Sequence, residues 1–156
     1  INWRTQFFNE HMRDVPKAPD DELFGFLTAL NTALKAQKDT GFDCDYVFNG
    51  ATMSTQPDQN ARNAMEPVNA AMIRAMRAGK DHPTEREDAS RDDVKALERA
   101  MRDAGAERDV IDRILRSGLN FVPIAERCDA GRYLYAAMAE QPKDRAGRLL
   151  AEMMGG

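Results

Sequence analysis

The sequence has few of the residues on which common catalytic and metal sites depend. Only two of its 156 residues are histidine, His11 and His82, and two are cysteine, Cys44 and Cys128. The cysteines match no CxxC or zinc-ligand spacing. No HExxH, GxSxG, P-loop, GxGxxG or EF-hand pattern occurs either. We therefore predict no catalytic residue, no metal ion and no cofactor, and we favour a non-enzymatic protein.

The chain also lacks any strongly basic segment. Its net charge is −4, from 22 lysines and arginines against 26 aspartates and glutamates. Residues 1–79 and 80–116 are each slightly acidic, and residues 117–156 are balanced. The turn at residues 104–106 invites comparison with a helix-turn-helix, but nucleic acids are bound through clustered positive charge. The charge pattern therefore predicts no nucleic-acid partner.

Long hydrophobic runs are missing. The longest uncharged apolar stretches, such as residues 134–139, are far shorter than the roughly 20 residues that span a bilayer. We therefore predict no membrane span and a soluble protein. No signal peptide is recognisable, but the chain opens at Ile1 rather than Met, so we expect a further segment upstream.

The spacing of the apolar residues predicts helices. Strand-like alternation occurs only around residues 42–48, and a lone strand has no partner, so we interpret residues 42–55 as a helical turn or a buried loop. Elsewhere, apolar residues recur three and four positions apart, as on one face of a helix. The clearest such stripe comprises Leu23, Phe26, Leu27, Leu30 and Leu34.

Turn and capping residues mark the ends of these helices. Gly41 is a predicted C-cap, and Ser90 with Asp93 is typical of an N-terminal capping box. Pro16 predicts a break after a first helix, and Pro67 a kink or restart near Glu66.

Together these signals predict an all-α fold. We expect an irregular bundle of about six to seven helices in one domain covering residues 1–156. Its two halves, residues 1–78 and 91–156, are each too small to prefer folding alone. The almost wholly polar residues 79–90 are predicted to form a hinge or surface loop between them.

The two cysteines leave two alternatives open. We favour two semi-buried free thiols. The alternative is a disulfide between Cys44 and Cys128, which would close a long loop and contribute about 4 kcal/mol to stability. A disulfide would place the protein in an oxidising compartment such as a bacterial periplasm, whereas free thiols fit the cytoplasm.

One segment is a candidate for a ligand pocket. The acidic clusters at residues 20–22, 87–88 and 92–93 lie at predicted helix starts or in the polar loop, so we interpret them as solvated charge. The acids near residue 44 lie instead among aromatic residues. An enzyme or small-ligand-binding protein would place its acidic–aromatic pocket there, lined by Asp43, Cys44, Asp45 and Tyr46.

The favoured function is protein binding. Nine methionines fall mostly on apolar helix faces, where they fill a core or form an adaptable groove. The last helix offers an interaction face, formed by Leu149, Leu150 and Met153. We therefore expect a helical interaction module of adaptor, inhibitor or immunity type. Its partner would be another protein or a second copy, as in a homodimer.

Overall fold

The computed structural model describes residues 3–41, 44 and 58–155, and within these ranges the chain contains helices and connecting segments but no strand. The all-α prediction is confirmed, with seven α-helices and two short 3-10 helices in this part of the chain. In order they are α1 (Trp3–His11), η1 (Met12–Lys17), α2 (Asp20–Thr40), α4 (Gln59–Asp81), α5 (Arg91–Asp103), α6 (Arg108–Ser117), η3 (Leu119–Phe121), α7 (Ile124–Ala139) and α8 (Lys143–Met153).

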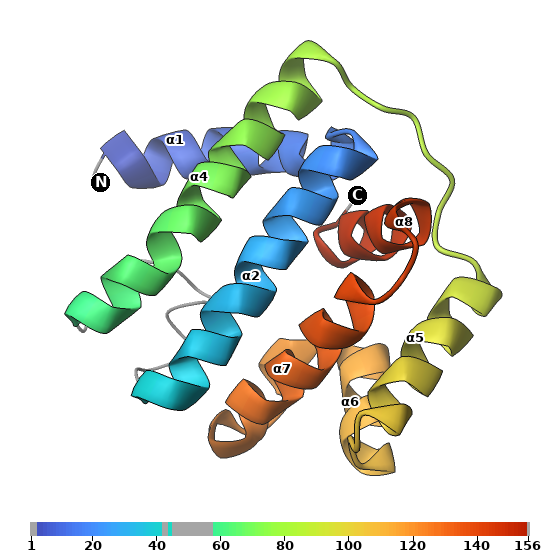
Figure 1. Ribbon diagram of the computed structural model, residues 1–156. Coiled ribbons are helices and arrows are strands. Elements are labelled where there is room, and N and C mark those ends of the chain that lie inside the picture. Colours follow the sequence, from blue (N-terminus) through green and yellow to red (C-terminus); the bar gives the residue numbers. More distant parts are fainter. Residues whose placement is uncertain (1–2, 42–43, 45–57, 156) are drawn as a thin grey trace.

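Helix α2 is central to the bundle. It lies between α4 on one side and α7 with α8 on the other (Figure 1). The short η1 packs against α4, and α5 packs against α7 at the far side of the molecule. Elements from the two halves of the sequence are therefore packed against each other along the length of α2.

The residues of α2 show why this helix takes the central place. Its apolar side chains lie on the buried stripe that the sequence predicts, extended by Ala33. Acidic residues occupy the first turn, where the helix dipole favours negative charge. At the other end Gly41 adopts φ 75°, and its N–H donates to the carbonyl of Gln37. The predicted C-cap is thus confirmed, in a left-handed conformation that glycine adopts without strain.

The hydrophobic core draws on both halves of the chain. Leu27 of α2, Met101 of α5 and Met138 of α7 are completely buried, and Leu150 of α8 is 2% exposed. Burying one such side chain stabilises the fold by about 1.5–3 kcal/mol. Several of the methionines therefore fill the core.

Only one of the two prolines acts as predicted. Helix α1 ends at His11, and Pro16 lies in the 3-10 helix η1, which ends at Lys17 before α2 begins at Asp20, so the predicted break after the first helix is present. Helix α4, by contrast, runs unbroken through Pro67. The predicted restart near Glu66 is wrong. Proline removes one helical hydrogen bond, but both Pro67 and Asn63, whose carbonyl loses its partner, are exposed. Water can therefore satisfy that carbonyl.

The polar segment between the halves is anchored at its middle. Helix α4 continues to Asp81, and residues 82–90, here called the strap, run along the outside of the molecule to α5 (Figure 1). The Thr84 N–H donates to the carbonyl of Lys17 at 2.8 Å. The Arg86 guanidinium, whose side chain is only 12% exposed, donates to the carbonyls of Pro16 and Ala18 and pairs with Asp20. The strap is thus held against η1 and the start of α2.

Candidate functional site

Most of the predicted acidic–aromatic pocket lies outside the described residues. Asp43, Asp45 and Tyr46 all fall in that part of the chain. Cys44 is described, and it is 2% exposed. Its sulfur is bonded to Cys128, so it offers neither a thiolate nucleophile nor a metal ligand.

The two cysteines form a disulfide. Their Cα atoms are 5.6 Å apart, within the range that a disulfide spans. The favoured prediction of two free thiols is therefore wrong. Spacing alone could not decide between the alternatives, because the distance depends on how α7 packs beside the end of α2. The bond ties the segment that follows α2 to the first half of α7.

The predicted interaction face on α8 is mostly internal. Leu149 is 5% exposed and Leu150 is 2% exposed, and both pack in the core. Met153 alone of the three lies at the surface, at 46% exposure. A partner could contact Leu149 or Leu150 only if α8 left its place, so the folded protein offers this face only at Met153.

A different part of the chain places large apolar side chains in water. Phe121 is 72% exposed and Ile124 is 70% exposed, at the junction of η3 and α7. Pro123 and Ala125 beside them are also exposed. We call Phe121, Pro123, Ile124 and Ala125 the apolar corner. Single exposed apolar residues are ordinary, but adjacent large ones are typical of a binding surface.

The apolar corner is fixed by its surroundings. Between its exposed residues, Val122 is 1% exposed and anchors the chain in the core. The Arg127 guanidinium donates to the carbonyls of Asn120 at 3.0 Å and Val122 at 3.1 Å. The disulfide at Cys128 follows directly in sequence. Phe121 and Ile124 are therefore presented by a backbone that is held from several sides.

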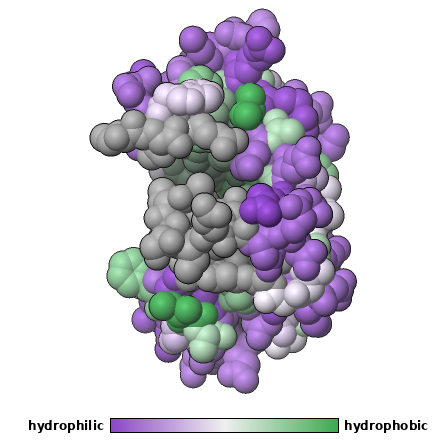
Figure 2. Space-filling view, turned by 90° about the vertical axis from the view of Figure 1, so that its left-hand side faces the viewer, coloured by the Kyte–Doolittle hydropathy of each residue, from purple (hydrophilic) through white to green (hydrophobic). Residues whose placement is uncertain are grey.

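Other exposed apolar side chains are more scattered. Ile73 on α4 is 47% exposed, and Trp3 and Phe7 on α1 are 73% and 40% exposed. The centroid of the Phe7 ring lies 6.1 Å from that of the Phe8 ring and 4.5 Å from that of the His11 ring. Phe7 is therefore partly covered by residues of its own helix. Among the coloured residues of the face drawn in Figure 2, hydrophilic ones predominate and hydrophobic ones form small, separate groups.

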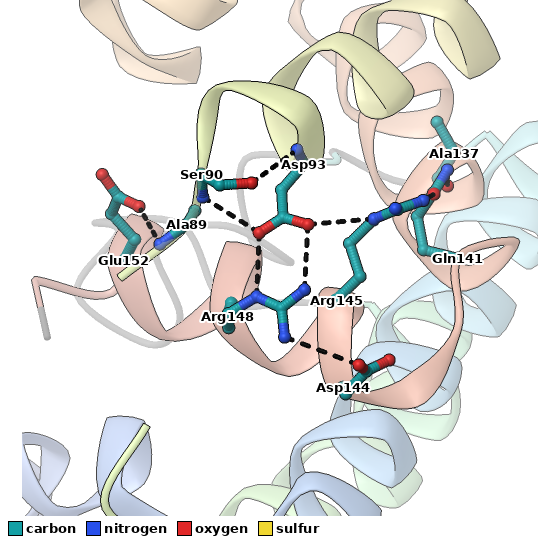
Figure 3. Close-up of polar contacts among 9 residues, drawn as sticks. All are labelled: Ala89, Ser90, Asp93, Ala137, Gln141, Asp144, Arg145, Arg148 and Glu152. Atoms are coloured by element: carbon teal, nitrogen blue, oxygen red, sulfur yellow. Dashed lines mark hydrogen bonds and ion pairs between the residues drawn. The ribbon is translucent and has the colours of Figure 1, made fainter. Parts of the chain in front are cut away.

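A buried carboxylate links α5 to α8. Asp93 is 2% exposed, and Figure 3 shows it pointing toward two arginines of α8. Arg145 Nε donates to Asp93 Oδ1 at 3.0 Å, and Arg148 donates to both carboxylate oxygens. Asp93 also completes the predicted capping box by accepting from the Ser90 N–H at 2.9 Å. The interpretation of residues 92–93 as solvated charge is therefore wrong for Asp93.

The network explains two shifted pKa values. The hydrogen bond from Arg148 holds the pKa of Asp93 well below its ordinary value, although burial of the carboxylate opposes this. The same hydrogen bond raises the pKa of Arg148. Both groups stay charged at any moderate pH, and each neutralises the charge of the other and forms hydrogen bonds with it. The arrangement therefore joins helices and shows no group prepared to exchange a proton.

Nothing in the described part of the chain gathers metal ligands. No group of three or more histidine, cysteine, aspartate or glutamate side chains lies close enough there to hold a metal ion. His11 Nδ1 lies 3.8 Å from Asp14 Oδ2, and His82 is exposed just beyond α4. Across the same residues, no helix is long and apolar enough to cross a membrane.

Comparison with known proteins identifies no relative. No family model, no curated protein and no solved structure matches the chain. Function must therefore be inferred from the molecule's own surface.

The sequence analysis missed both the apolar corner and the buried network. Three of residues 119–122 are apolar, and their position between Gly118 and Pro123 makes them a short connector rather than a helix face. That combination is a signal for exposed apolar residues, since a short turn cannot bury every side chain. Asp93 carried one usable signal, the capping motif that begins at Ser90.

Proposed function

We propose that this protein acts by binding another protein, and that the apolar corner is part of its binding surface. The observation that carries the proposal is the exposure of Phe121 and Ile124, at 72% and 70%, on a fixed turn. Apolar surface left in water forgoes about 25 cal/mol per Å². A partner that covers these two side chains recovers that free energy.

The fixed backbone strengthens this proposal. Binding is weakened when flexible groups must be ordered, and a surface already held in place avoids most of that cost. Arg127 and the Cys44–Cys128 disulfide hold the corner before any partner arrives. Aromatic side chains also contribute a large share of the energy at protein interfaces, which makes Phe121 the expected anchor. Adaptor, inhibitor and immunity roles are all forms of such binding.

Site-specific cross-linking tests the proposal. Phe121 is replaced by the photoreactive amino acid benzoylphenylalanine in the full chain, and Ile73 is replaced in the same way as a matched control. We expect one protein, or a second copy of this chain, to cross-link at position 121 and not at position 73. Equal products at both positions, or none at position 121, would overturn the proposal.

A further inference from the structure

A groove separate from the apolar corner lies between η1, the strap and the end of α8. Its volume is about 930 Å³, which is within the usual range for ligand sites. Four apolar side chains line the bottom of the groove, which we call its floor. They are Met12 and Pro16 from η1, and Ala151 and Met154 from the end of α8.

Most of the positive charges that line the groove are neutralised by ion pairs, whereas its negative charges are not. Three of its four cations are paired with acids outside the lining: Lys17 with Asp14, Arg86 with Asp20, and Arg148 with Asp93. Its four acids are Glu85, Glu87, Asp88 and Glu152. None of them forms an ion pair with any described residue; Glu152 accepts only from the Ala89 N–H, as Figure 3 shows. The fourth lining cation, Arg13, forms no ion pair with a described residue and offsets only one of the four acids, so the groove carries net negative charge.

The strap also presents unused backbone groups. The N–H groups of Thr84 and Ala89 are hydrogen-bonded, but between them no described residue bonds to the backbone N–H or C=O groups of residues 85–88. Arg86 points inward and is largely buried, whereas its neighbours Glu85 and Glu87 are exposed. This alternation is that of an extended strand. An extended strand with free backbone groups can pair with another chain.

We propose that this groove binds an extended peptide segment of another protein in which basic and apolar side chains alternate. The peptide backbone pairs with residues 85–88. Its basic side chains meet Glu85, Glu87 and Asp88, and its apolar side chains reach the floor at Met12 and Met154. The end of α8 adds to the attraction, because the C-terminus of a helix favours positive charge. This site does not depend on the apolar corner.

Peptides of defined composition test the proposal. The probe is a fluorescein-labelled eight-residue peptide of alternating lysine and leucine, and its counterpart has glutamate in place of lysine. We expect the lysine peptide alone to bind in fluorescence anisotropy, and its affinity to fall as salt rises. Absence of binding, or equal binding of the glutamate peptide, would overturn the proposal.

A matched pair of variants locates the binding. The groove variant carries Glu85→Gln, Glu87→Gln and Asp88→Asn, and the control carries Glu66→Gln, Asp103→Asn and Glu140→Gln at exposed acids outside the lining. Both change the net charge equally. We expect the groove variant to bind the lysine peptide about tenfold more weakly, because three exposed charge pairs of about 0.5 kcal/mol each are lost. The control should bind the peptide as the unmodified protein does. Equal losses would mean general charge attraction and contradict the proposal.

Hydrogen exchange checks the backbone pairing independently. Because the amides of residues 85–88 have no hydrogen-bond partner in the described part of the chain, they should exchange rapidly in the free protein and slow when the lysine peptide binds. Protection confined to other segments would contradict binding along the strap. This readout also separates the peptide site from the apolar corner, where exchange should stay unchanged.

Discussion

The Arg148 guanidinium donates hydrogen bonds to both oxygens of the Asp93 carboxylate, from Nε at 2.8 Å and from Nη2 at 2.9 Å. The two residues lie on α8 and α5, so this bidentate pair fixes the end of the strap against the last helix (Figure 3). Arg145 adds a third contact to the same carboxylate. A buried charge of this kind destabilises a protein when its partner is removed.

Replacing Asp93 by alanine should therefore destabilise the fold strongly. The change leaves two arginines without their shared partner and removes the α5 cap, so we expect a loss of about 3–5 kcal/mol in urea unfolding. Asp92→Ala is the control, because the neighbouring side chain is exposed and should cost less than about 1 kcal/mol. Similar losses for both variants would mean that the buried network contributes little.

The same carboxylate should make stability depend on acidic pH. Its folded-state pKa lies below its unfolded value, so its contribution is complete above about pH 5 and decreases as the pH falls below about 4. Urea unfolding between pH 2 and 7 measures this dependence. Asp93→Asn should be less stable than the unmodified protein at pH 7, and the difference should narrow toward pH 2. A constant difference would contradict the lowered pKa.

Two glycines in helices should respond oppositely to alanine. A Cβ at Gly79 of α4 would collide with the backbone carbonyl of Asp14 in η1, whereas a Cβ at Gly25 of α2 would meet nothing within 4 Å. We expect Gly79→Ala to destabilise by about 1–3 kcal/mol through overpacking, because backbone atoms cannot move aside as a side chain can. Gly25→Ala should stabilise by about 0.5–1 kcal/mol, because alanine favours the helix. Thermal unfolding of both variants gives the comparison, and a stabilising Gly79→Ala would show that α4 does not pack so closely on η1.

The disulfide should contribute substantially to stability. Its cysteines are 84 residues apart in sequence, and closing a loop of that size is worth about 4–5 kcal/mol in the chain-entropy treatment. Reductant should therefore lower the thermal midpoint. Thiol titration of the unfolded, non-reduced protein should detect no free thiol, and two would exclude the bond. A bonded pair is the kind of cross-link that persists in an oxidising compartment.

The sequence predicts structural features that depend on neighbouring residues better than those that depend on residues far apart in the chain. The stripe that begins at Leu23, the Gly41 cap and the Ser90 capping box all involve neighbours along the chain, and the structure confirms them. The capping box distinguishes Asp93 from Asp92 in the sequence, but no local pattern shows that Asp93 also faces the arginines of α8 and is buried there.

The candidate surfaces were harder to predict for a related reason. Leu149 and Phe121 are both large and apolar, and composition favours burying both. Packing leaves Leu149 5% exposed and Phe121 72% exposed, since α8 lies across α2 while η3 is a short turn at the periphery. The groove depends on η1, the strap and α8 together, which no single segment reveals.

The measurement that tests the account most directly is the affinity for the partner that cross-links at position 121. With purified components, the double variant Phe121→Ser and Ile124→Ser should weaken binding about thirtyfold or more, the effect of losing an interface anchor. Ile73→Ser changes an exposed apolar residue on α4, away from the apolar corner, and should alter the affinity less than about twofold. If the double variant binds as tightly as the unmodified protein, the apolar corner is not the binding surface and the central claim is wrong.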